Sequence, residues 1–177
     1  MDIGITGLNL TDRDLARLPV RGVAAVALRL AIRVAPIYAS WSASDEKIQQ
    51  MQDVLSHSTA VLHGQDDPDS LLGSAEVAYR LAAAAAADSR TRGSEQSQRA
   101  AVAGMIIHTV VDAMADIDDD RQATVINVVL AIRAASRLQD AILIENIRGD
   151  LIQLQALAEE RGQMNWTEFE PFGKLER

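Results

Sequence analysis

The chain has 177 residues, of which 17 are basic and 25 acidic, and it contains no cysteine and only six aromatic residues. This length predicts one domain that can bury a core of its own. The lack of cysteine excludes a disulfide framework, a thiolate zinc site and a catalytic thiol. The formal net charge of −8 argues against nucleic acid as a partner, because such binding needs a basic surface that neutralises phosphates.

The first long helix is predicted from its proline signals. Residues 11–14, TDRD, form a capping box that starts a short turn. Pro19 ends this turn and then opens a helix that we expect to reach about Ile37, since proline is tolerated in a first turn. Pro36 is expected to end or kink that helix near Ala35.

Two more helices are predicted in the first half of the chain. Ser42 or Ser44 caps the next helix, which has an apolar stripe formed by Ile48, Met51, Val54, Leu55, Thr59 and Leu62. The helix after it runs from about Pro68 to Asp88. It contains six consecutive alanines, residues 82–87, whose small side chains allow a neighbouring helix to approach closely.

The second half of the chain also has helical patterns, after a predicted loop at 89–94, SRTRGS. We expect helices over about 95–115, from an aspartate cap at 118–120 to about 138, and over 139–161. Gly149 is a point where the last helix can break. Residues 124–129, TVINVV, are β-branched enough for a strand but stand alone between helices. The sequence therefore predicts a single all-α domain over 1–177, a bundle of about six long helices.

The most apolar stretch, residues 23–38, is too short for a membrane span of about 20 residues and contains Arg29 and Arg33. It also lies too far from the N-terminus, and is too charged, for an export signal. We therefore expect a cytoplasmic protein that does not enter a membrane.

Arg29 and Arg33 lie in a helix that is apolar on nearly every side, so neither can be far from buried surface. A buried guanidinium needs an acidic partner. The candidates are acidic residues of apolar helices, namely Glu76, Asp112, Glu145 and Asp150. The sequence favours structural ion pairs for both arginines, with an anion-binding site as the alternative.

Metal-binding chemistry has one weak set of candidates. His108 and Asp112 share a helix face at a spacing of four, Asp116 extends it, and Asp53 and His57 repeat the spacing elsewhere. A metal-dependent hydrolase using His57, His108, Asp112 and Asp116 is therefore the alternative function. The Glu-x-x-His pairs of ferritin-like sites and the HExxH motif are absent from the sequence.

Other familiar motifs are missing. Residues 116–120, DIDDD, do not continue as an EF-hand, because Arg121 and Asn127 stand where that loop needs glycine and glutamate. The phosphate-binding GxxxxGK[ST] and the nucleophile motif GxSxG do not occur. We therefore expect no cofactor, and the sequence favours a non-enzymatic protein.

The C-terminal segment, residues 165–177, is aromatic and irregular. Its apolar residues recur every three positions, but Pro171 and Gly173 prevent a regular helix; they are Trp166, Phe169, Phe172 and Leu175. We expect this tail to pack on the bundle. The alternative is that its side chains anchor a partner, since aromatic residues concentrate at binding hot spots.

Charge is unevenly distributed along the chain. Residues 45–70 carry six acids and one base, and residues 101–120 carry five acids and no base. The first 40 residues carry five arginines and three aspartates. Such blocks either attract each other within the fold or present an acidic face to a basic partner.

The two ends of the chain resemble a family of bacterial all-helical proteins. The matching residues of the first long helix are Arg21, Arg29, Arg33, Pro36 and Tyr38, and those near the C-terminus are Asp150, Leu151, Leu154 and the FGKL motif at 172–175. Some members are predicted immunity proteins of contact-dependent or polymorphic toxin systems. The resemblance implies a cytoplasmic protein-interaction module that binds and neutralises a cognate toxin. Self-association through a second copy is compatible with this function and with the hydrolase alternative.

Overall fold

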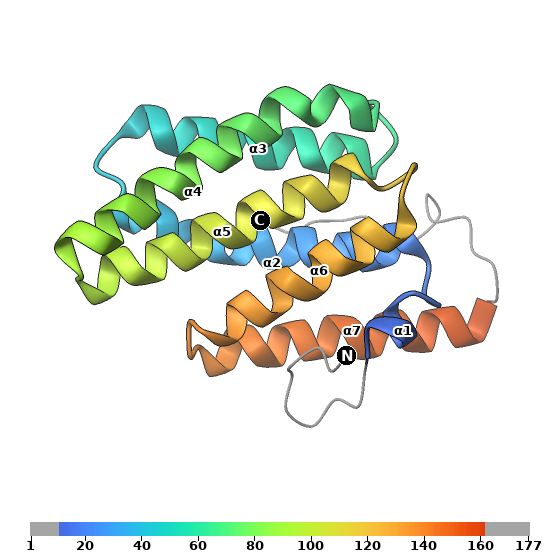
Figure 1. Ribbon diagram of the computed structural model, residues 1–177. Coiled ribbons are helices and arrows are strands. Elements are labelled where there is room, and N and C mark those ends of the chain that lie inside the picture. Colours follow the sequence, from blue (N-terminus) through green and yellow to red (C-terminus); the bar gives the residue numbers. More distant parts are fainter. Residues whose placement is uncertain (1–10, 162–177) are drawn as a thin grey trace.

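The computed structural model describes residues 11–161, with side chains as far as Glu159, and confirms the all-α bundle (Figure 1). The tail at 165–177, with Trp166, Phe169, Phe172 and Leu175, lies outside the described residues. The described elements are α1 (Asp12–Leu15), α2 (Val20–Trp41), α3 (Asp45–Leu62), the 3-10 helix η1 (Pro68–Leu71), α4 (Leu72–Arg92), α5 (Glu95–Ala115), α6 (Arg121–Ser136) and α7 (Ala141–Arg161).

Helices α2 and α5 lie in the middle of the bundle and pack against each other (Figure 1). On one side of this pair, α4 packs on α5 and α3 packs on both α2 and α4. On the other side, α6 packs on α5 and on α2, and α7 packs on α2 and α6. The α2–α5 pair is therefore shared by two groups of helices, α3–α4 and α6–α7.

The contact between α4 and α5 depends on small residues. A Cβ atom added at Gly104 of α5 would lie 3.0 Å from the Cα atom of Ala82 in α4, closer than such atoms normally come. Ala85 of α4 and Ala103 of α5 are fully buried. The predicted close approach of a neighbour to the alanine run is therefore present in the structure.

Three of the predicted helix caps are confirmed. Thr11 and Asp14 form the capping box of α1, and the Ser44 hydroxyl accepts a hydrogen bond from the Lys47 amide at the start of α3. The Asp120 carboxylate accepts hydrogen bonds from the amides of Gln122 and Ala123 at 2.9 Å each. Helix capping therefore accounts for the last aspartate of the DIDDD sequence.

Of the two predicted effects of Pro36, an end to the helix is wrong, because α2 continues to Trp41. Pro36 is exposed, and proline cannot donate the helical hydrogen bond to the carbonyl four residues earlier. Two contacts hold the turn beyond it: the Tyr38 hydroxyl donates to the Leu81 carbonyl at 3.2 Å, and the Trp41 indole donates to Asp88 at 2.8 Å.

The predicted loop at 89–94 is also wrong over most of its length. Helix α4 continues to Arg92, and only Gly93 and Ser94 separate it from α5. Gly93 has φ of +62°, a conformation that favours glycine and ends the helix. The last turn carries Arg90 and Arg92, which interact favourably with the negative end of the helix dipole.

Within the described residues, α2 is the one helix that is long and apolar enough to cross a membrane, judged by length and composition. Of its most apolar 18-residue window, 61% is buried inside the bundle. Its role in this fold is that of a core helix. Helix α7 runs unbroken through Gly149, which is exposed.

Candidate functional site

Arg29 and Arg33 of α2 both reach one carboxylate of α7. Arg29 Nη1 lies 3.1 Å from Asp150 Oδ1, and Arg33 Nη1 lies 2.5 Å from Asp150 Oδ2. The Asp150 side chain is only 8% exposed, whereas those of Arg29 and Arg33 are 17% and 30% exposed. Asp150 is thus the partner among the four predicted candidates, and this cluster joins α7 to the core helix.

The other three candidate partners of these arginines lie elsewhere. Glu76 is exposed and pairs with Arg80 one turn away, and Glu145 is exposed and pairs with Arg148. The third candidate, Asp112, lies beside His108. Of the four candidate acidic residues, Asp150 is thus the one that pairs with Arg29 and Arg33.

His57 connects α3 to the segment that begins α4. Its Nδ1 atom lies 2.9 Å from the Ser74 hydroxyl, its Nε2 atom lies 2.8 Å from the Ser70 hydroxyl, and Nε2 is 3.9 Å from Asp66. Both ring nitrogens therefore have hydrogen-bond partners within the fold. Asp53, one turn earlier, accepts a hydrogen bond from the Gln49 amide instead.

His108 and Asp112 form a pair on α5, with His108 Nε2 3.5 Å from Asp112 Oδ2. The His108 ring also contacts Tyr79 of α4 edge to face, and its Nδ1 atom is buried without a hydrogen-bond partner among the described residues. Between residues 11 and 159, no group of three or more histidine, aspartate or glutamate side chains could hold a metal ion. Of the four candidate ligands, His108 and Asp112 therefore lie beside each other, whereas the ring of His57 is bonded to serine hydroxyls.

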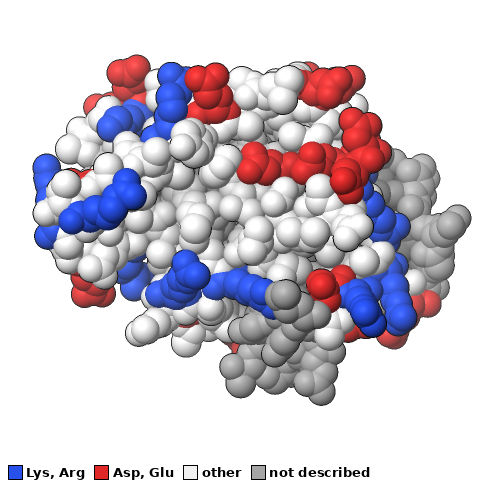
Figure 2. Space-filling view, viewed as in Figure 1, with Lys and Arg blue, Asp and Glu red and all other residues white. Residues whose placement is uncertain are grey.

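Two acidic stretches that are far apart in the sequence meet at one surface, because η1 packs against α5. Figure 2 shows acidic side chains running across the face toward the end where α5 meets α6. We call this surface the acidic patch. Its members are Asp66, Asp67 and Asp69 around η1, and Asp112, Asp116, Asp118, Asp119 and Asp120 at the end of α5 and the turn to α6.

The carboxylates at the end of α5 are electrostatically unfavourable to one another. Burial raises the pKa of Asp112, with His108 acting in the opposite direction. Burial also raises the pKa of Asp116, and the charges of Asp112, Asp120 and Asp119 raise it further. Asp112 lies in the last turn of α5 and Asp116 caps it, where the helix dipole is negative and no basic residue is present.

One arginine offsets part of the acidic patch. Arg21 Nη2 lies 2.7 Å from both carboxylate oxygens of Asp118, and Arg21 Nη1 donates to the carbonyls of Val61 and Leu62. This side chain joins the end of α3 to the turn between α5 and α6. It therefore helps to hold the two acidic stretches at the same surface.

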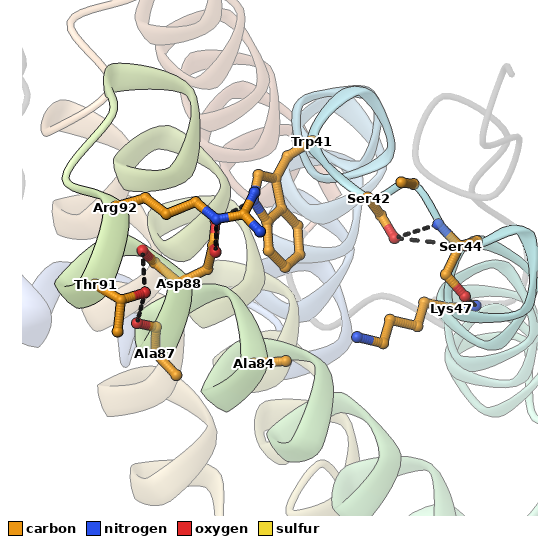
Figure 3. A pocket seen from close by; sticks show the side chains of 10 residues that line it. Trp41, Ser42, Ser44, Lys47, Ala84, Ala87, Asp88, Thr91 and Arg92 are labelled. Carbon is orange, nitrogen blue, oxygen red and sulfur yellow. Dashed lines mark hydrogen bonds and ion pairs between the residues drawn. The ribbon is translucent and has the colours of Figure 1, made fainter.

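A shallow groove lies away from the acidic patch, between the start of α3 and the end of α4 (Figure 3). Its volume is about 530 Å³, and Ala84 and Ala87 form part of its wall. Asp88 joins Trp41 to Arg92, whose Nε atom lies 2.9 Å from Asp88 Oδ1. Nothing in the sequence indicated this groove, because its lining comes from three helices and contains no motif.

Comparison of the chain with models of protein families, with curated proteins and with solved structures finds no match. The resemblance to predicted immunity proteins therefore rests on its motif residues. In this structure four of those residues, Arg21, Arg29, Arg33 and Tyr38, bond to other helices or to the turns between them, whereas the FGKL motif lies outside the described residues. These four residues contribute to how the fold is assembled, and none of them is part of the acidic patch, although Arg21 pairs with its member Asp118.

Proposed function

We propose that the protein is a cytoplasmic, non-enzymatic interaction module of immunity type, which binds a basic toxin through the acidic patch and neutralises it. The observation that carries this proposal is the meeting of two separate acidic stretches at one surface, with Arg21 as a basic side chain paired to it. Charges of one sign gathered on one surface attract a partner of the opposite sign.

The charges of Asp112 and Asp116 are unfavourable to the fold. Asp112 and Asp116 occupy the C-terminal turn and cap of α5, where an acidic side chain is unfavourable and a basic one would stabilise the helix. Helix α4 ends in the opposite way, with Arg90 and Arg92 in its last turn. The acidic end of α5 therefore costs stability, and a cationic partner would remove that cost.

Charge complementarity also suits the task of an immunity protein, which must reach its toxin quickly. Long-range attraction between an acidic surface and a basic one raises the association rate, and salt screens it. Contact with a cation would also lower the pKa of Asp112 and Asp116, since it stabilises the ionised carboxylates. We therefore expect binding to weaken at high salt and as these groups become protonated.

The test uses the product of the gene next to the one that encodes this protein, which the proposal takes to be the toxin. Cells that express this product are expected to stop growing, and co-expression of the wild-type protein is expected to restore growth. The double variant Asp112→Asn/Asp116→Asn should lose this protection. A matched control, Glu46→Gln/Glu145→Gln, removes the same charge from exposed positions outside the acidic patch and should protect like wild type.

Titration calorimetry with the purified adjacent product completes the test. Wild type and control should bind it, and the Asp112→Asn/Asp116→Asn variant should bind at least tenfold more weakly. Equal binding by all three proteins, or no binding by wild type, contradicts the proposal. Stoichiometric manganese, iron or zinc in the purified protein would also contradict it and would favour the hydrolase that uses His57, His108, Asp112 and Asp116.

A further inference from the structure

The outer face of α6 carries an apolar centre between two charged ends. Ile126 and Leu130, one turn apart, are 47% and 50% exposed, whereas the neighbouring Val128 is fully buried. They are two of the six large apolar residues that the described part of the chain leaves exposed. Spacings of three and four place further residues on the same face, namely Gln122, Arg133 and Arg137.

The charges on this face are separated along the helix. Asp119 is exposed just before α6 begins, and Asp120 is already committed to capping the helix. Arg133 lies in the last turn, and Arg137 is exposed just after it. Figure 2 likewise shows acidic side chains at one end of this face, basic ones at the other and uncharged surface between them.

A face with an acidic end, an apolar centre and a basic end is complementary to a second copy of the same face in antiparallel orientation. If a second α6 lies antiparallel across the first, with a two-fold axis near Val128, then Ile126 faces Leu130 of the other copy. Asp119 and Arg137 are equally many residues from Val128 and flank the two ends of α6, so the antiparallel arrangement brings each toward the other across the interface. Every residue contact is then made twice, as a two-fold interface requires.

We propose that the protein forms a homodimer through an antiparallel contact between two α6 helices. The dimer covers Ile126 and Leu130, and it pairs Asp119 of each copy with Arg137 of the other. A contact centred on one helix per subunit lies at the small end of specific interfaces, about 1,000 Å² in total. We therefore expect a dissociation constant in the micromolar range.

This inference goes beyond the proposed function, because it needs no toxin. Of the acidic patch it uses Asp119, and it leaves Asp112 and the aspartates around η1 accessible to a partner. The two proposals can therefore fail separately. Association is measured on the purified full chain alone, whereas protection is measured with the adjacent gene product.

The test measures self-association of the full chain by sedimentation equilibrium over micromolar to submillimolar concentrations. Wild type should show a monomer–dimer equilibrium. Asp119→Arg alone and Arg137→Glu alone should each weaken association at least tenfold, since each places like charges opposite one another at two points. Leu130→Asp should abolish association, while circular dichroism and urea unfolding show that each variant remains folded.

The decisive arm is an equimolar mixture of the Asp119→Arg and Arg137→Glu variants. In a two-fold dimer both of its charged contacts become attractive again, so the mixture should associate like wild type, as should the chain that carries both substitutions. A wild-type chain that stays monomeric throughout overturns the proposal. The proposal is also overturned if the charge substitutions leave association unchanged while Trp166→Ala/Phe172→Ala abolishes it, because the tail is then the contact.

Discussion

The two charged regions of this molecule differ in how their charges are compensated. Between α2 and α7, Asp150 lies between Arg29 and Arg33, and the three side chains are mostly buried. At the end of α5, the half-buried Asp112 and Asp116 lie among other carboxylates, and burial together with the charges of these neighbours raises the pKa of Asp116. The first region holds opposite charges together within the fold, and the second exposes charges of one sign.

The difference separates charges that stabilise the fold from charges that the proposed partner would bind. The buried cluster joins α7 to the core helix, and removing one member leaves a charge that water cannot reach freely. The carboxylates of the acidic patch make contacts at its edges: Asp118 meets Arg21, Asp120 caps α6, and Asp116 accepts a hydrogen bond of 3.4 Å from the Asn127 side chain of α6. Unlike Asp150, none of them lies between two arginines within the described residues. Substitutions in the two regions should therefore change stability in opposite directions.

The largest effect is expected for Asp150→Ala, which removes the buried carboxylate that Arg29 and Arg33 share. Breaking a buried ion pair in this way should lower the free energy of unfolding by about 3 kcal/mol. Urea unfolding followed by circular dichroism measures the loss. An unchanged midpoint would show that the cluster does not hold α7 in place.

A matched apolar replacement sharpens that result. The triple variant Arg29→Met/Arg33→Met/Asp150→Leu removes all three charges of this cluster. Most of the stability lost in Asp150→Ala should therefore return. This variant should also bind the adjacent gene product like wild type. If its stability holds but binding disappears, the two arginines bind a ligand, and their structural assignment is wrong.

A smaller effect of opposite sign is expected for Asp116→Asn. The substitution removes a negative charge from the C-terminal cap of α5 and from the vicinity of Asp112, Asp119 and Asp120. We expect the free energy of unfolding to rise by about 0.5 kcal/mol, the usual size of a charge–dipole term. A clear loss of stability in urea unfolding would show that this carboxylate supports the fold.

The smallest effect is a pH dependence. The pKa of Asp112 and of Asp116 is raised above 3.8 in the folded chain, so the folded state holds more protons than the unfolded state just above that pH. These two groups therefore lower stability as pH rises through this window. The Asp112→Asn/Asp116→Asn variant should gain on wild type across the same window and show no gain below it. A constant difference between the two proteins at all pH values would contradict this account.

The helices and their caps could be predicted from the sequence because their signals are local. Thr11, Ser44 and Asp120 each cap a helix through amides within three residues. The helix end predicted as one effect of Pro36 is wrong, because contacts of Tyr38 and Trp41 with α4 hold the turn beyond it. Sequence spacing cannot reveal such contacts, because their partners are more than 40 residues away.

The residues of the candidate site could be predicted from the sequence, but their arrangement in space could not. Both acidic stretches could be read directly, and Asp150 was one of four possible partners for the arginines. That η1 meets α5 depends on how α3 and α4 pack, which no local pattern encodes. The same holds for His57. Both of its ring nitrogens bond to the hydroxyls of Ser70 and Ser74, and its spacing to Asp53 in the sequence does not predict these contacts.

The most direct test of the account is whether the Asp112→Asn/Asp116→Asn variant protects cells against the adjacent gene product. We expect a protein that is at least as stable as wild type, is expressed at the same level and yet fails to restore growth, while the Glu46→Gln/Glu145→Gln control restores it. Full protection by the patch variant would contradict the claim that the acidic patch binds the toxin.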